Sequence, residues 1–145
     1  MERLTHAYHA KLQEMCDCFM DTDYLAELQR PLDVNSDVLE EETMRYFALL
    51  ILYTVTIKAK QLTVKREPGV VKVTVDTGEE KQALSPPPEA IATTIMAMVR
   101  AMTHIEDDHG ETVFSLGLRN TPLELRVKVK RSGDVESVKL KFPEL

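Results

Sequence analysis

The sequence predicts an α+β fold in which helices cover one antiparallel sheet. Apolar residues recur at spacings of three and four in three segments, as they do in helices with one buried stripe. Other segments alternate apolar and polar residues and follow one another without an intervening helix, which favours hairpins over a βαβ winding. We expect N-terminal helices, then a β-hairpin, a helix and a three-stranded antiparallel meander forming one sheet packed on helices. Residues 1–36 form the expected helical extension and residues 37–145 the expected α+β domain.

The first helix is expected over about residues 3–20, and residues 24–28 are expected to add a further turn. Pro31 ends this region, because proline disfavours a helical conformation of the residue before it. The apolar stripe of the first helix consists of Leu4, Tyr8, Leu12, Met15 and Phe19.

Ser36 or Asp37 is the expected N-cap of the second long helix. Over residues 44–59 this helix is apolar on almost every side. Such a helix belongs in the middle of a fold, or it has a second face that another subunit covers.

The first hairpin is predicted from two alternating runs, residues 61–67 and 71–75, with Pro68-Gly69 as the turn. Residues 79–83 are expected to extend it by a short third strand.

The third long helix is expected to begin at Leu84-Ser85-Pro86-Pro87-Pro88-Glu89 and to end at about Thr103. Ser85 is the predicted N-cap, and the prolines are tolerated in the first turn because its N–H groups have no partner inside the helix.

Three further strands are predicted over residues 112–119, 123–130 and 135–142. Ser132-Gly133-Asp134 is the expected turn of the last hairpin. The middle strand has the clearest alternation, which predicts one buried and one solvated face. Its apolar positions are Leu123, Leu125, Val127 and Val129, and its polar positions are Glu124, Arg126, Lys128 and Lys130.

Composition and charge limit the classes of function that the chain can have. The chain has 145 residues, 43% of them apolar, which suits one domain with a real core. Its net charge of −6 argues against nucleic acid as a partner, because phosphate backbones demand a concentrated basic surface. No signal peptide is recognisable, and no apolar run reaches the roughly eighteen residues of a membrane span. We therefore expect a cytoplasmic protein without direct membrane insertion.

Two clusters of potential ligands are present, and neither predicts a metal or catalytic site. His6, His9, Cys16 and Cys18 match no zinc spacing, and cysteines two residues apart on a helix point in different directions. An ordinary amphipathic helix with reduced thiols is the favoured interpretation. The second cluster comprises Glu106, Asp107, Asp108 and His109. For these residues a solvated loop is the favoured interpretation. We expect no metal, no cofactor and no catalytic residue.

From about Thr43 to Leu140 the chain resembles the N-terminal domain that precedes the motor in type II secretion and type IV pilus assembly ATPases. The matching pieces, in family order, are Ala59-Lys60-Gln61-Leu62-Thr63-Val64-Lys65, Val71-Lys72-Val73-Thr74-Val75-Asp76 with Gly78, Leu84-Ser85-Pro86-Pro87, the helix to Met102, His109-Gly110-Glu111, and Leu123-Glu124-Leu125-Arg126-Val127. The chain departs from the family at Lys60-Gln61, Lys72, Thr74 and Glu111, and keeps a family arginine at Arg126.

The resemblance implies a non-catalytic protein-interaction domain that serves as an adaptor or regulator of a secretion or pilus ATPase. The motor's phosphate-binding motif, Gly-x-x-x-x-Gly-Lys-Ser/Thr, is absent from these residues, so we expect no enzyme activity. Arg126, Lys128 and Lys130, with Lys139 and Lys141, form a candidate basic stripe for docking an acidic partner surface.

Two alternatives remain open. One is a dimeric cytoplasmic chaperone or binding module for an apolar client segment, suggested by the apolar helix at residues 44–59. The other is a small-molecule pocket between sheet and helices, for which the sequence shows no convergent set of polar residues.

Overall fold

The structure is a computed structural model that describes residues 2–119 and 121–143, with side chains from residue 7 onwards. The elements in chain order are α1 (Glu2–Phe19), α2 (Tyr24–Leu28), α3 (Leu39–Thr56), β1 (Gln61–Glu67), β2 (Val70–Asp76), β3 (Lys81–Leu84), α4 (Glu89–Thr103), β4 (His109–Leu118), β5 (Thr121–Ser132) and β6 (Val135–Lys141). The predicted α+β class is confirmed.

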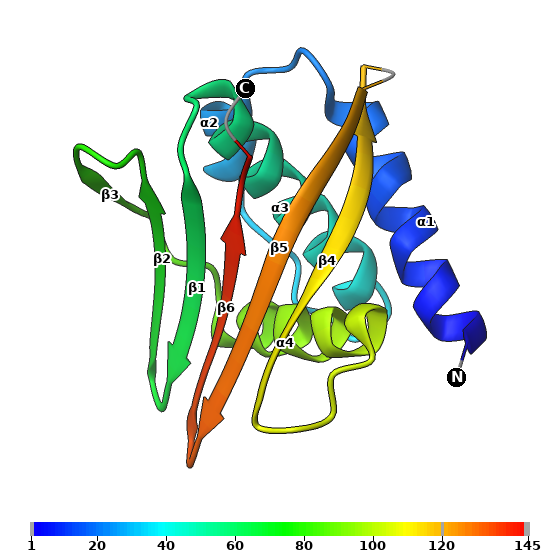
Figure 1. The fold of residues 1–145 in the computed structure, drawn as a ribbon, viewed down its shortest axis with the longest axis vertical. Helices are drawn as coiled ribbons and strands as arrows, with labels where there is room; N and C mark the ends of the chain where they lie inside the picture. Colours follow the sequence, from blue (N-terminus) through cyan, green and yellow to red (C-terminus); the bar gives the residue numbers. More distant parts are fainter. Residues whose placement is uncertain (1, 120, 144–145) are drawn as a thin grey trace.

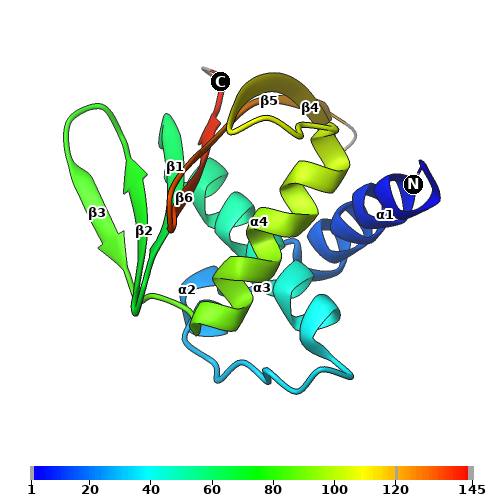
Figure 2. The same ribbon diagram turned by 90° about the horizontal axis from the view of Figure 1, so that it is seen from below.

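The six strands form one antiparallel sheet in the order β3-β2-β1-β6-β5-β4. Each half of the sheet is a meander of three consecutive strands, and the halves meet where β1 pairs with β6. All the helices lie on one face of the sheet, and the other face is open (Figures 1 and 2). None of the helices in residues 2–119 and 121–143 is long and apolar enough to cross a bilayer.

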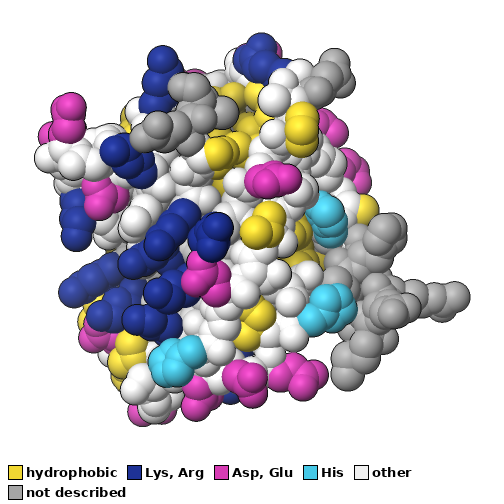
Figure 3. All heavy atoms as spheres, viewed as in Figure 1, with side chains coloured by type: hydrophobic (Ala, Val, Ile, Leu, Met, Phe, Trp, Pro, Cys, Tyr) yellow, Lys and Arg dark blue, Asp and Glu magenta, His cyan; other side chains and the backbone are white. Residues whose placement is uncertain are grey.

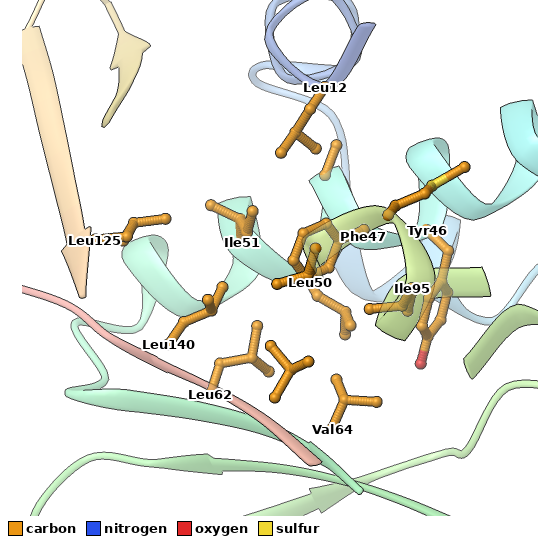
Figure 4. Close-up of a cluster of buried hydrophobic side chains, with 14 of the residues drawn as sticks. Leu12, Tyr46, Phe47, Leu50, Ile51, Leu62, Val64, Ile95, Leu125 and Leu140 are labelled. Atoms are coloured by element: carbon orange, nitrogen blue, oxygen red, sulfur yellow. The ribbon is translucent and has the colours of Figure 1, made fainter. Parts of the chain in front are cut away.

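Helix α3 lies at the centre of the core, as its apolar sequence predicts. Leu49, Leu50 and Ile51 are completely buried, because α1, α2, α4 and the sheet surround the helix. Helix α1 contributes Leu12 to the same core, and α4 contributes Ile95 (Figure 4). Helix α1 therefore packs on the body of the protein.

The two predicted helix caps are wrong. Helix α4 begins at Glu89, its N-cap position is Pro88, and no side chain caps it. Ser85 cannot serve because every residue that precedes a proline is pushed to an extended conformation, and three consecutive prolines delay the helix until the last of them. Helix α3 begins at Leu39 after Val38, likewise without a side-chain cap, so neither Ser36 nor Asp37 has that role.

Strands β4 and β5 are longer than their alternating sequences predict. Pairing continues to His109 opposite Lys130, three residues before the predicted start of β4. Gly110 interrupts the alternation there, yet it is required: a Cβ atom at this position would lie 2.5 Å from Cγ2 of Ile105. The glycine lets the loop after α4 pack directly against the strand.

Helix α1 covers the free edge of β4. The amide of Gln13 exchanges two hydrogen bonds with the backbone of Gly117, each 2.7 Å long. Nε2 of His9 lies 2.8 Å from the carbonyl oxygen of Ser115, and the His9 ring contacts Phe114 at a centroid distance of 4.6 Å. Side chains of α1 thus form hydrogen bonds with backbone groups of the edge strand that would otherwise be available to another strand.

Candidate partner-binding face

The outer face of the sheet carries a concentration of basic side chains. Leu125, Val127 and Val129 of β5 are buried against the helices, so the residues between them point the opposite way. This places Arg126, Lys128 and Lys130 together on the outer face, as the alternation predicts. Lysine and arginine side chains gather over this face of the molecule (Figure 3).

The register of the sheet adds β6 to this surface. Lys139 lies directly opposite Lys128, and Lys141 lies directly opposite Arg126. The stripe suggested by the sequence is therefore two strands wide.

Strands β1 and β2 extend the surface further. Lys65 lies opposite Lys72, and its other neighbour is Ser137 of β6. On β1, β2, β5 and β6 the outward positions hold three carboxylates, Glu67, Asp76 and Glu124. The same positions hold seven cations, here called the basic face: Lys65, Lys72, Arg126, Lys128, Lys130, Lys139 and Lys141.

Few of these cations are neutralised within the protein. Arg126 pairs with Glu111 of β4 at 3.2 Å, and Lys65 pairs with Glu67 at 3.4 Å. The other five form no ion pair with any residue in the part of the chain that the structure describes; they are Lys72, Lys128, Lys130, Lys139 and Lys141.

Three like-charged pairs face each other directly across strands: Lys65 with Lys72, Lys128 with Lys139, and Arg126 with Lys141. Cβ atoms of such pairs are about 5 Å apart, and like charges at that distance destabilise a sheet. The arrangement therefore opposes folding slightly while it concentrates positive charge on this face of the sheet.

The histidine and cysteine cluster named from the sequence is not assembled within the described residues. Cys16 is buried in the core and Cys18 is exposed, while His9 is bound at the edge of β4. Burial raises the pKa of the Cys16 thiol to about 12, and the charge of Asp17 adds to this effect. The His6 side chain lies outside the described residues. Within residues 7–119 and 121–143, no three histidine, cysteine or acidic side chains are grouped to hold a metal ion.

The acidic segment after α4 is tied to the rest of the fold. Nη1 of Arg100 donates to the carbonyl oxygen of Asp107 at 2.7 Å, and Asp108 pairs with Arg131 of β5 at 3.1 Å. His109 belongs to β4 and not to the predicted loop. These contacts position the loop against the sheet.

A partly buried ion cluster on the helix-facing side of the sheet was not predicted. Glu136 of β6 bridges Arg66 of β1 at 3.2 Å and Arg100 of α4 at 3.6 Å. The three side chains are 13–17% exposed. The cluster joins the centre of the sheet to α4, so we assign it to stability.

No protein-family model matches this chain, and no curated protein sequence matches it either. The resemblance to the N-terminal domain of secretion and pilus ATPases stays a prediction.

Proposed function

We propose that this chain is a non-catalytic protein-interaction domain that docks an acidic surface of a partner protein on its basic face. The observation that carries the proposal is the set of three like-charged cross-strand pairs. The whole chain is acidic, with 24 carboxylate residues against 18 lysine and arginine residues. Folding alone gives no reason to place seven cations side by side, whereas an acidic partner would relieve their repulsion.

A protein partner fits better than a nucleic acid. The overall charge of −6 repels a polyanion at long range. The outward positions of β1, β2, β5 and β6 hold no Phe, Tyr or Trp side chain on which bases could stack, and the ring that borders them on β4 is the imidazole of His109, opposite Lys130. Binding a compact acidic patch on a protein requires neither aromatic stacking nor a long basic groove.

A secretion or pilus assembly ATPase is the partner that we propose, on the basis of the resemblance between residues 43–140 and the pre-motor domain. In that family the domain lies above the motor and moves with it. A separate copy of this domain would act as an adaptor or regulator of the motor ring.

The experiment compares partner capture by three tagged proteins. K128E/K139E reverses the centre of the basic face. K11E/K58E makes the same change in net charge on α1 and in the loop after α3, away from this face. Captured proteins are identified by mass spectrometry, with and without nuclease.

Under this proposal, the wild type and K11E/K58E capture the same partner and K128E/K139E loses it. A secretion or pilus ATPase as that partner supports the adaptor role. Identical capture by all three proteins contradicts docking on the basic face. Nuclease-sensitive capture contradicts the choice of a protein partner.

The dimeric chaperone receives less support. It was suggested by the apolar sequence of α3, and that helix is covered by other elements of the same chain.

A further inference from the structure

We propose that the basic face binds a phosphoryl group above Ser137, so that the acidic surface of the partner protein carries a phosphorylated side chain. This inference rests on the proposed function and names the chemical group that the basic face recognises. The site consists of the hydroxyl of Ser137 and the lysines around it, Lys65, Lys130 and Lys139, and is here called the Ser137 site.

The register of the sheet gathers these lysines around one hydroxyl. Ser137 of β6 lies directly opposite Lys130 of β5 on one side and directly opposite Lys65 of β1 on the other. Lys139 follows Ser137 by two residues on the same strand and therefore shares its face. Cβ atoms are about 5 Å apart between directly opposite residues and about 7 Å apart between residues two positions apart on a strand. The flexible stems of the lysines can thus bring their ammonium groups to a single anion.

The hydroxyl of Ser137 is open to such an anion. The residue is partly exposed, and its oxygen is not one of the buried side-chain atoms that lack a partner. Its side chain forms no hydrogen bond with any residue in the part of the chain that the structure describes. A serine hydroxyl is a directed donor, whereas an ammonium group acts on a phosphate mainly as a point charge. Ser137 therefore adds a fixed contact to the attraction of the lysines.

The lysines of the Ser137 site are free to bind an external anion. Lys130 and Lys139 form no ion pair within residues 7–119 and 121–143. Lys65 pairs with Glu67 at 3.4 Å, but its side chain is 45% exposed. Such exposed pairs are weak, so this contact can yield to an anion of higher charge.

A phosphoryl group matches this arrangement better than a single carboxylate does. It carries a charge of about −1.5 to −2 at pH 7 and offers three acceptor oxygens, whereas a carboxylate carries one charge on two oxygens. The chain's net charge of −6 repels an extended anionic surface such as a membrane. A single phosphoryl group interacts mainly with charges within the screening length of about 8 Å, and around Ser137 these include the three lysines. A phosphorylated side chain of a protein is therefore the source that we propose.

The test uses two acetylated peptides, Gly-Glu-X-Glu-Gly, in which X is phosphoserine or glutamate. Each is titrated into the full-length protein, and its dissociation constant is measured from the NMR shifts of the backbone amides of β5 and β6. S137A removes the hydroxyl, and K130Q/K139Q removes two lysines of the Ser137 site. K72Q/K141Q is the matched control, because it removes two cations from the same face that are not direct neighbours of Ser137.

We expect the phosphoserine peptide to bind more tightly than the glutamate peptide. K130Q/K139Q should weaken its binding about tenfold and S137A about threefold, the value of one hydrogen bond, whereas K72Q/K141Q should change it by less than about threefold. Equal affinities of the two peptides would overturn the choice of a phosphoryl group, as would the absence of shifts with both. Equal losses in the two double variants would overturn the Ser137 site.

Phosphatase treatment of the lysate distinguishes a failure of this inference from a failure of the proposed function. Under the inference, capture that is lost in K128E/K139E is also lost after phosphatase treatment. Capture that survives phosphatase but not K128E/K139E would overturn the Ser137 site and leave docking on the basic face intact. Vesicles of phosphatidylcholine with phosphatidylinositol 4-phosphate test the other source of phosphate. Binding to these vesicles without binding to the phosphoserine peptide would overturn the choice of a protein.

Discussion

Gln13 and Gly117 are paired as two neighbouring strands would be: Nε2 of Gln13 donates to the carbonyl oxygen of Gly117, and the N–H of Gly117 donates to Oε1 of Gln13. One side chain of α1 thereby satisfies both backbone groups of a residue in an edge strand. Sheets usually associate with other sheets through unpaired edges. This contact therefore protects the protein from self-association through β4, and it also stabilises the fold.

Replacing Gln13 by alanine is expected to lower the free energy of unfolding by about 1 to 2 kcal/mol and to promote self-association through β4. Urea unfolding measures the first effect, and light scattering at increasing concentration measures the second. Glu14→Ala, on an exposed side of the same helix, is the control. A Gln13→Ala protein as stable and monomeric as this control would contradict the role given to the contact.

Gly110→Ala is expected to destabilise the protein by about 1 to 3 kcal/mol, because the new Cβ would overlap with the side chain of Ile105. Thermal or urea unfolding measures the change. Gly117→Ala in the same strand is the control, since its Cβ would meet Gln13 only at 3.7 Å. If steric overlap is the cause, Ile105→Ala should recover part of the loss in the double variant.

Glu136→Gln is expected to reduce the free energy of unfolding by about 2 kcal/mol, because it leaves Arg66 and Arg100 without their shared carboxylate below the sheet. Glu124→Gln is the control, because Glu124 is exposed on the outer face of the sheet. Equal stability of the two variants would show that the ion cluster contributes nothing to the free energy of unfolding.

The fall of stability between neutral and acidic pH should depend on Glu42. The hydrogen bond from Arg45 lowers the pKa of this carboxyl group; burial opposes the shift, and a backbone hydrogen bond from Asp33 adds to it. A lowered pKa in the folded state stabilises the protein above the pKa of an unfolded glutamate, and this contribution is lost as the pH falls through the folded pKa. Glu42→Gln should therefore cost stability at neutral pH and little in strong acid, as urea unfolding across that range would show. A cost independent of pH would contradict this linkage.

The two thiols should react at very different rates. Cys18 is exposed, whereas Cys16 is buried and its pKa is raised to about 12, so almost none of it is thiolate at neutral pH. With a disulfide reagent that releases a coloured thiolate, we expect one rapid equivalent in the folded protein and a second only after unfolding. Cys18→Ser should abolish the rapid phase, and two rapid equivalents in the wild type would contradict the buried position of Cys16.

The positions of most elements could be predicted from the sequence because their periodicity is local. The predicted strand at residues 61–67 matches β1, and the alternation of β5 correctly placed Arg126, Lys128 and Lys130 on one face. The predicted N-cap of α4 was wrong because three prolines follow Ser85, and each proline pushes its predecessor to an extended conformation.

The full extent of the candidate site depends on contacts between distant residues. Lys65 and Lys72 join the basic face only because β1 pairs with β6, and no local pattern indicates which strands become neighbours. A pocket lined by Leu25 of α2, Tyr46 of α3 and Gln82 of β3 likewise requires these three elements to meet. A search for polar residues close together in the sequence could not find it.

The pairing of β1 with β6 also sets the order in which the protein can be built. Strand β6 leaves the ribosome last of the six strands, yet its place is at the centre of the sheet. Until it emerges, β1 presents the backbone N–H and C=O groups that β6 will pair with at an open edge of the nascent sheet. Completion of the sheet must therefore wait until β6 has been translated, and ribosomes stalled before residue 135 should carry chains that depend on chaperones.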